Sequence, residues 1–385
     1  MTKNIGLIDP QLNSSLSGGN ITYITEYLFP LLGNSNDYKI TLINYSKFGS
    51  KEVLNHIDKY SSVELLKVKA NKLDNYVEEF NKLDYILLLD TVAVYDTRRN
   101  RDLYDFLSTI GKPIVLSVHT TFSEWRKKKL VHEDNFLTHT NLYKVILYRS
   151  GYYNEMLEYI SEFNLHVPID LNEDTVYYHC PHISYLDQSR VIDYKDRPKG
   201  YAYIGRTSSV KKWYLYIRSI VSNKATYFTN YYYLSSLSLT WSFDLNRYEK
   251  EVSMMTEDQK RRMVATQSYK PSDLHEYANS IRVSCLPTMI KDNGFPGEWT
   301  FQECITLGII PIVANYMKGT LPEELLFLED FMIEPSKSTV VDVDAMMSSH
   351  TEEQLEEYSR ILMDYAKRNW IDPSVAYNHL SSVLS

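Results

Sequence analysis

The chain has 385 residues and a net charge of −8, and 44% of its residues are hydrophobic. This length is too great for one compact core and predicts two domains, and the composition excludes a disordered chain. No apolar run in the sequence approaches the length of a membrane span. The acidic balance argues against a general nucleic-acid coat, although a local basic groove stays compatible with it.

Two further features of the sequence bear on where the protein works. The first residues pass straight into a predicted strand and have no signal-peptide layout. The three cysteines, Cys180, Cys285 and Cys304, are scattered and have no metal-ligand spacing. We therefore expect a cytoplasmic protein that contacts no membrane and needs no bound metal.

The first part of the chain alternates apolar strands with helix-like stretches. We predict strands at residues 5–9, 38–44, 63–68, 85–90, 113–119 and 145–149, and helices around 20–32, 71–81, 100–109 and 150–161. Buried apolar strands that alternate with helices are typical of a parallel, doubly wound sheet. The pattern therefore predicts a Rossmann-like, acceptor-binding domain over residues 1–175.

A second alternating pattern follows a stretch, 176–198, that we interpret as a linker. Strands at 201–205, 281–285 and 309–313, with a helix at 272–279, predict a second Rossmann-like domain over 199–350. Residues 222–252 are predicted to be irregular. The tail, 351–385, is predicted to form two helices broken near Asp372 and Pro373 and to pack toward the N-terminal domain. Ligands of such sheets bind at the carboxyl ends of the strands, so we expect a cleft between the domains.

Two glutamates, Glu298 and Glu303, lie on a predicted short helix that precedes a Gly308 turn and a buried strand. The start of a helix favours an anion, and a carboxylate there can accept hydrogen bonds from ribose or hexose hydroxyls. A nucleotide-sugar pocket would use both properties. The alternative is that both glutamates are solvated residues that complement the helix dipole.

Two cations, Arg206 and Lys211, follow a predicted strand that ends at Gly205 and precede a helix. A guanidinium and an ammonium at the carboxyl edge of a sheet have the chemistry that a diphosphate needs. Fixed cations also stabilise the negative charge that grows on a leaving diphosphate during glycosyl transfer. The alternative is a pair of surface basic residues after a strand.

Three other segments are candidates for ligand contacts. Gly18 and Gly19, after the first strand, would let backbone N–H groups approach a ligand, although an ordinary turn is equally compatible. His119 ends a strand and is either a structural histidine or a contact for a sugar or acceptor. The loop with Tyr269 and Lys270 is placed before a helix where its backbone could contact a nucleobase.

Two basic runs follow the strands that end at Asp90 and His119. The candidate phosphate contacts in them are Arg98, Arg99, Arg101, Arg126, Lys127 and Lys128. Charge runs are usually solvated helix faces. Their position after strand ends nevertheless suits phosphate contacts from an acceptor polymer.

In this order, the segments resemble the retaining GT-B glycosyltransferases. The pattern is a strand with Gly-Arg-x4-Lys at its end, the strand–helix unit at 264–287, Gly294-Phe295, a glutamate-bearing helix, and Gly-x-x-Pro before a strand. The large family usually has seven residues between its two glutamates, whereas only four residues lie between Glu298 and Glu303. That shorter spacing and the core Gly205-Arg206-Thr207 are similar to the DNA α-glucosyltransferases of T-even phages.

The resemblance implies a GT-B fold and a metal-independent reaction with a UDP-sugar donor, UDP-glucose in the nearest case. It implies that Arg206 and Lys211 bind the diphosphate, that Glu303 holds the ribose, and that Glu298 lies near the ribose or the donor sugar. His119 would contact the sugar or acceptor. It further implies donor-binding roles for the following residues: Gly18, Gly19, Tyr269, Lys270, Gly294 and Phe295.

The resemblance also implies an acceptor. This would be a 5-hydroxymethyl pyrimidine, such as hydroxymethylcytosine, in double-stranded phage DNA, modified by a monomeric enzyme. Thr120 stands where the phage enzymes have an acid after the histidine, which puts an acceptor-activating role of that position in question. The alternatives are a GT-B enzyme with a polysaccharide, lipid or protein acceptor, and a non-catalytic sugar-nucleotide or nucleic-acid binding protein.

Overall fold

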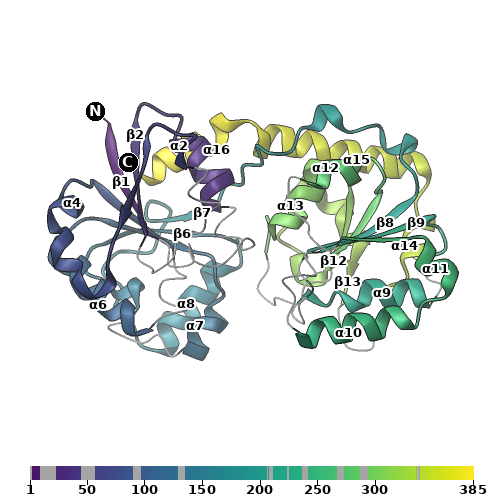
Figure 1. Ribbon diagram of the computed structural model, residues 1–385, viewed down its shortest axis with the longest axis horizontal. Coiled ribbons are helices and arrows are strands. Elements are labelled where there is room, and N and C mark those ends of the chain that lie inside the picture. The colour runs from purple at the N-terminus through teal and green to yellow at the C-terminus, as the bar shows by residue number, and fades with distance from the viewer. Residues whose placement is uncertain are drawn as a thin grey trace. The chain divides into compact units, whose positions relative to one another are not determined.

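The chain folds into two compact units. The computed structural model describes residues 2–8, 23–44, 57–89, 97–128, 135–205, 207, 211–222, 225–235, 242–266, 273–286, 294–334, 336 and 339–385. Unit 1 comprises Met1–Ser184 and Asp372–Ser385, and unit 2 comprises Tyr185–Ile371 (Figure 1). Among the described residues, no helix is both long and apolar enough to cross a bilayer.

The described residues of unit 1 form a seven-stranded sheet in the order β3-β2-β1-β4-β5-β6-β7, and every pairing is parallel. Its strands are β1 (Lys3–Ile8), β2 (Tyr38–Asn44), β3 (Val63–Lys67), β4 (Tyr85–Leu89), β5 (Ile114–Val118), β6 (Leu142–Leu147) and β7 (Val176–Tyr178). All five residues of β5 are buried, as expected for a strand with helices on both faces.

The helices of unit 1 lie on both faces of its sheet. They are η2 (Tyr23–Leu28), α2 (Phe29–Leu32), η3 (Ala70–Tyr76), α4 (Val77–Asn81), α6 (Thr97–Ile110), α7 (Phe122–Lys128), η5 (Phe136–Thr138), α8 (Tyr152–Glu162) and α16 (Pro373–Val383). Because parallel crossovers are right-handed, the two directions of growth from β1 and β4 place helices on opposite faces. Figure 1 shows α2 and α16 on one face and α6, α7 and α8 on the other.

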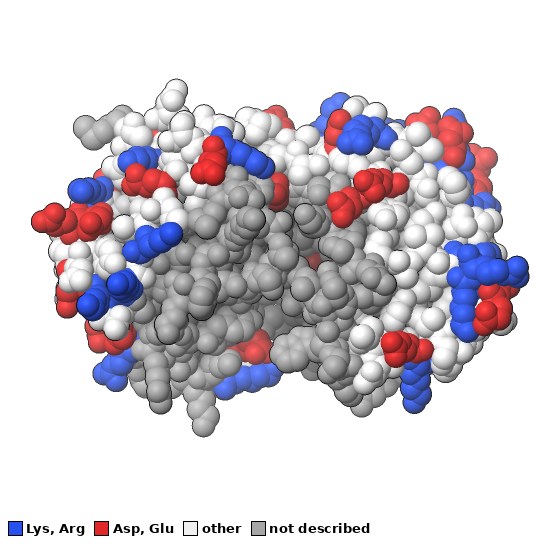
Figure 2. Space-filling model, viewed as in Figure 1, with Lys and Arg blue, Asp and Glu red and all other residues white. Residues whose placement is uncertain are grey.

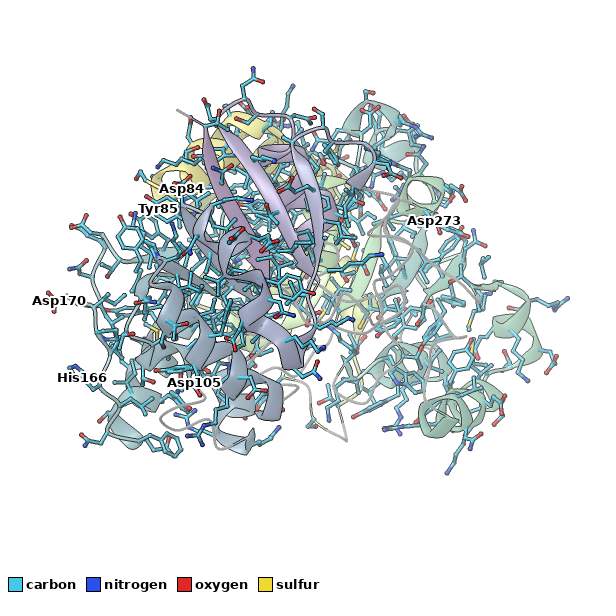
Figure 3. All side chains as sticks on the ribbon, turned by 60° about the vertical axis from the view of Figure 1, so that its left-hand side comes forward. Asp84, Tyr85, Asp105, His166, Asp170 and Asp273 are labelled. Carbon is cyan, nitrogen blue, oxygen red and sulfur yellow. The ribbon has the colours of Figure 1, made fainter. Side chains whose placement is uncertain are left out.

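The C-terminal tail is attached to the amino-terminal edge of the unit 1 sheet. Lys3 Nζ donates to the Leu384 carbonyl at 2.8 Å, and Lys144 Nζ donates to the Ser382 carbonyl at 3.1 Å. At the same edge, the Asp84 carboxylate accepts the Asn4 N–H at 2.7 Å; Figure 3 shows Asp84 and its neighbour Tyr85 at the start of β4. These contacts leave the carboxyl ends of the strands to the loops that carry His119 and Arg149.

The described residues of unit 2 form a six-stranded parallel sheet in the order β10-β9-β8-β11-β12-β13. Its strands are β8 (Gly200–Ile204), β9 (Asn230–Leu234), β10 (Met263–Ala265), β11 (Val283–Leu286), β12 (Ile310–Ala314) and β13 (Met332–Ile333). With the sheet of unit 1, this arrangement confirms the predicted α/β class with two doubly wound parallel sheets.

The helices of unit 2 also cover both faces of its sheet. They are η6 (Gln188–Arg190), η7 (Tyr194–Asp196), α9 (Tyr214–Val221), α10 (Ser242–Ser253), α11 (Glu257–Arg261), α12 (Leu274–Ala278), α13 (Trp299–Thr306), η11 (Asn315–Met317), η12 (Glu323–Phe331), α14 (Val343–Ser348), α15 (Glu352–Ala366) and η13 (Lys367–Ile371). Figure 1 shows α9 and α10 on one face and α12 and α15 on the other. Within that second layer α13 packs on α15.

Three sequence predictions need correction. Residues 222–252 are not irregular where they are described, because they contain β9 and α10. The tyrosines of β9 are buried, and Tyr233 stacks on Tyr203 with ring centroids 5.0 Å apart. Aromatic residues pack well on a pleated surface, so this tyrosine run forms a strand. The sequence pattern also missed α7.

The third correction concerns the segment predicted as a linker, 176–198. Its first residues form β7, the edge strand of the first sheet, and the residues from Tyr185 onward belong to unit 2. The helices of the tail are broken at the predicted place, since α16 starts at Pro373. Of these helices, α15 belongs to unit 2 and α16 to unit 1.

Candidate functional site

Hydroxyl groups connect the carboxyl ends of neighbouring strands in unit 2. Gly205 ends β8 with a φ of 139°, a conformation that favours glycine. Two residues later, the buried Thr207 Oγ1 lies 2.8 Å from Tyr233 Oη and 2.8 Å from Ser235 Oγ, both at the end of β9. The Gly205-Arg206-Thr207 core is thus anchored on both sides of Arg206, which itself lies outside the described residues.

An ion pair joins the two candidate motifs of unit 2. Lys211 Nζ, between β8 and α9, donates to Glu298 Oε2, and the two side chains are 20% and 16% exposed. The sequence predicts Glu298 on the helix. In the structure it is instead the N-cap residue of α13, with extended backbone angles. The structure therefore brings together a cation and a carboxylate that are 87 residues apart in the sequence.

Glu303 is a buried carboxylate on α13, only 2% exposed. The alternative of a solvated helix residue is therefore wrong for it. Tyr185 Oη donates a hydrogen bond to Glu303 Oε1 at 2.5 Å. Burial raises the pKa of Glu303 to about 7, and the hydrogen bond from Tyr185 acts in the opposite direction. The carboxyl group can therefore change its protonation state near neutral pH.

The turn with Gly294 and Phe295 precedes α13. Phe295 stacks on Trp370 with ring centroids 5.9 Å apart, and its N–H donates to Thr320 Oγ1 at 3.0 Å. The Gly294 carbonyl accepts the Gly297 N–H at 3.0 Å. These contacts fix the entry of the chain into α13 and so the position of Glu298.

In unit 1, the corresponding strand ends carry an aromatic cluster around His119. His119 Nε2 lies 2.9 Å from Ser117 Oγ, and its ring packs against Tyr23 and Tyr148 with centroids 4.6 and 4.8 Å away. Tyr148 in turn stacks on His179, at 4.6 Å. Burial, with a smaller contribution from the Arg149 charge, lowers the pKa of His119 to about 3, so its imidazole is neutral at physiological pH.

Thr120 and Arg149 complete the described surroundings of His119. Trp125 Nε1 on α7 donates to Thr120 Oγ1 at 2.9 Å, so this hydroxyl has a structural contact. Arg149 follows β6, is 7% exposed, and has its guanidinium 5.7 Å from the Tyr152 ring centroid.

The basic runs are partly occupied by intramolecular ion pairs. Arg126 Nε lies 2.6 Å from Glu162 Oε2 on α8, and Lys127 pairs with Glu124 on its own helix. Arg101 lies on α6 and is exposed. Arg98, Arg99 and Lys128 also lie on α6 and α7, but their side chains fall outside what the structure describes. On the face shown in Figure 2, the described Lys and Arg atoms are interspersed with Asp and Glu atoms.

Several predicted site residues cannot be placed. Five of them lie outside the described residues: Gly18, Gly19, Arg206, Tyr269 and Lys270. Within the described ranges, no group of three or more His, Cys, Asp or Glu side chains is arranged to hold a metal ion.

Two residues of the site were not assigned a role from the sequence. Tyr185 lies 118 residues before Glu303, in the predicted linker, so no local pattern points to their contact. Thr207 belongs to a motif that the sequence analysis singled out, but its hydrogen bonds reach residues 26 and 28 positions away.

Comparison with known proteins gives matches at the level of structure. No protein-family model matches the chain, and no curated protein sequence does. Among solved structures, it is similar to HepE of Anabaena in complex with UDP, with 10% identity, coverage of 100% of this chain and 99% of that chain, and a TM-score of 0.66. It is also similar to a sucrose-phosphate synthase of Thermosynechococcus elongatus, with 10% identity, 98% coverage of both chains and a TM-score of 0.67.

A UDP-N-acetylglucosamine 2-epimerase matches less well, with 9% identity, coverage of 98% of this chain and 94% of that chain, and a TM-score of 0.53. At these identities the matches establish the GT-B fold of two Rossmann-like domains and leave the chemistry to be argued from the residues. The resemblance to the phage enzymes remains a prediction.

Proposed function

We propose that the protein is a retaining glycosyltransferase that takes its sugar from a UDP-sugar and binds this donor in unit 2. The observation that carries the proposal is the joining of the two motifs: Lys211 contacts Glu298 directly before α13, and the buried Glu303 follows on that helix. A nucleotide sugar needs a cation for its diphosphate and a carboxylate for its ribose, and this edge of the sheet supplies both.

The diphosphate is proposed to bind Arg206 and Lys211. The Lys211 ammonium is paired with Glu298 in the structure. The diphosphate would take over this ammonium, because it carries more negative charge than one carboxylate. Glu298 would then be released toward the sugar or ribose hydroxyls. Arg206, which lies between Gly205 and Thr207 in the sequence, would supply the second cation.

Transfer would break the bond between the anomeric carbon and the diphosphate oxygen and form a bond from that carbon to the acceptor oxygen. The transition state would resemble an oxocarbenium ion. In retaining transfer on one face of the sugar, the departing diphosphate oxygen takes the acceptor proton, so UDP leaves and no protein nucleophile is needed. Lys211 and Arg206 would stabilise the charge that develops on this leaving group.

The acceptor proposed first is a hydroxymethylated pyrimidine in DNA, flipped out of the duplex. The five-residue spacing of Glu298 and Glu303 and the Gly205-Arg206-Thr207 core support it. A small sugar or sugar phosphate is the second candidate. The fold likeness to a sucrose-phosphate synthase favours it, as does the pairing of Arg126 and Lys127 with carboxylates.

Incubation with UDP-glucose and other UDP-sugars tests the proposal, with unmodified DNA, 5-hydroxymethylated DNA, sugars and sugar phosphates as separate acceptors. We expect release of UDP that depends on an acceptor and is lost in Lys211→Ala. Stimulation by 5-hydroxymethylated DNA alone would support the DNA acceptor, and stimulation by a sugar would replace it. Epimerisation of the UDP-sugar without release of UDP would refute glycosyl transfer.

A further inference from the structure

The segment 185–197, which we call the strap, is fixed along α13 in unit 2. Gln188 Nε2 donates to the carbonyls of Thr306 and Met363, both at 2.8 Å. Arg197 Nη2 donates to the Leu307 carbonyl at 3.0 Å. The strap is also bonded to α12 and the residue after it, through Asp187 to His275 at 2.6 Å and Ile192 to Asn279 at 2.9 Å. These hydrogen bonds hold the strap, and with it Tyr185, in place beside α13.

The carboxylate of Glu303 is only half satisfied. Oε1 accepts the hydrogen bond from Tyr185, whereas Oε2 accepts none from any residue that the structure describes. The residue is only 2% exposed. Among the described residues, the buried side-chain atoms without a partner do not include Oε2, so this oxygen is accessible from the surface. The free oxygen is therefore suited to donors that arrive with a ligand.

We propose that Tyr185 is a positioning residue, which orients the Glu303 carboxylate so that Oε2 faces the ribose hydroxyls of the donor nucleotide. This inference rests on the proposed function, because it concerns the same donor site. It also states a specificity: the 2′-hydroxyl of a ribonucleotide would be bonded, so the site would discriminate against 2′-deoxyribonucleotides. A site built to bond a hydroxyl rejects the analogue that lacks it.

The protonation of Glu303 gives this inference a pH dependence. Burial raises the pKa of Glu303 to about 7, and the Tyr185 hydrogen bond holds it from rising further. Loss of the hydroxyl would raise that pKa, so a larger fraction of Glu303 would be protonated at neutral pH and unable to accept from both ribose hydroxyls.

Other ionisable groups on the packed elements are engaged elsewhere. Burial raises the pKa of the adjacent Cys304, so it is a neutral thiol. On the strap, Lys195 pairs with Glu356 and Arg197 donates to backbone carbonyls, among them that of Leu307. On α15, Glu352 pairs with Arg282, and Arg360 pairs with Glu357 and Asp364. His275 of α12 is bonded to the backbone of Asp187, and Lys211 pairs with Glu298 at the start of α13.

Calorimetric titration of the full chain with UDP and with 2′-deoxy-UDP tests the role of Tyr185. In the wild type we expect UDP to bind about tenfold more tightly than the deoxy analogue at about pH 7.5, as a hydrogen bond to a charged group predicts. Tyr185→Phe should lose most of this preference at that pH, and a rise to about pH 9 should restore only the part of the loss that comes from protonation of Glu303.

Tyr194→Phe is the matched control. Tyr194 is a buried residue of the same strap, and its hydroxyl has no hydrogen-bond partner among the described residues. It should bind both nucleotides as the wild type does. Tyr185→Phe with unchanged discrimination, or an equal loss of discrimination in Tyr194→Phe, would overturn the positioning role. A wild type that binds no UDP would overturn the proposed function together with it.

Discussion

The carboxyl ends of the two sheets carry different chemistry. In unit 1 they hold aromatic rings, two neutral imidazoles and the buried Arg149 guanidinium, since burial lowers the pKa of His119 to about 3 and that of His179 well below its usual value. In unit 2 they hold the Lys211–Glu298 ion pair and the buried Glu303. The unit 1 edge is therefore dominated by rings that suit a hydroxyl-bearing group, and the unit 2 edge by charged groups that suit a nucleotide.

Burial has opposite consequences at these two edges. It keeps His119 without charge across the physiological range, so this residue can donate or accept a hydrogen bond but is not an acid. It brings Glu303 to the point where a small change in its surroundings decides its charge. The same physical effect thus makes the unit 1 edge insensitive to pH and the unit 2 edge sensitive to it.

The largest effect is expected from Lys211→Ala, which removes the described cation of the proposed donor site. Transfer should fall by roughly 100- to 1000-fold, because a preorganised group that stabilises developing charge is lost. The rate constant and the circular dichroism spectrum are to be measured together. The neighbouring Lys212, whose Nζ lies 5.8 Å from the Tyr214 ring centroid, gives the control Lys212→Gln, which should retain activity.

Equal losses in Lys211→Ala and Lys212→Gln would indicate a general field effect of positive charge. A folded Lys211→Ala variant with near-normal turnover would mean that the diphosphate does not bind Lys211. The comparison between the strand ends of unit 1 and unit 2 would then lose its basis.

A second effect is expected from Glu303→Gln on stability. Because the pKa of Glu303 rises from 4.5 to about 7 on folding, the folded state binds the proton more tightly than the unfolded state does. This carboxyl group therefore lowers the free energy of unfolding progressively as the pH rises from about 4.5 through about 7. Glu303→Gln, which is neutral, should be more stable than the wild type at about pH 8 by on the order of 3 kcal/mol.

Urea unfolding at about pH 8 and about pH 4.5 measures this difference, which should vanish at the lower pH. The same variant should bind UDP at least tenfold more weakly, since Gln offers the ribose a single acceptor oxygen. A variant less stable than the wild type at both pH values would contradict the claim that the ionised, buried Glu303 carboxylate lowers the stability of the folded protein.

The smallest effect is expected at His119, whose imidazole should not take up a proton in the physiological pH range. Its imidazole should stay neutral between about pH 5 and about pH 8, because its pKa is lowered to about 3. Proton NMR shows this directly, with the resonance assigned by its loss in His119→Gln. A resonance that moves with a midpoint near pH 6.5 would show that the unit 1 edge is charged in the same range as the unit 2 edge.

The sequence predicts the strands well where they are aliphatic and buried. The apolar runs that form β4 and β5 are too short for typical helices and are bounded by turn residues, so they are predicted as strands. It fails at β9, where tyrosines replace aliphatic residues and only the packing of rings such as Tyr203 on Tyr233 shows that they are interior.

The sequence predicts which residues belong to the candidate site, but it does not predict which residues they contact. The positions of Lys211, Glu298 and Glu303 follow from local patterns. Their partners do not, because the hydrogen bonds of Lys211 and Tyr185 cross 87 and 118 residues of sequence. Whether a glutamate is buried, as Glu303 is, also depends on this tertiary packing, here on the strap and α15, and no helical pattern contains it.

Titration calorimetry of UDP against the wild-type protein and Lys211→Ala tests the central claim, that unit 2 binds a nucleoside diphosphate through its charged edge. Uridine is the companion ligand, because it has the ribose without the diphosphate. We expect UDP to bind the wild type and to lose about 100-fold in affinity in Lys211→Ala, while the weaker binding of uridine stays unchanged. Equal affinities of both proteins for UDP, or no binding of UDP at all, would contradict the account.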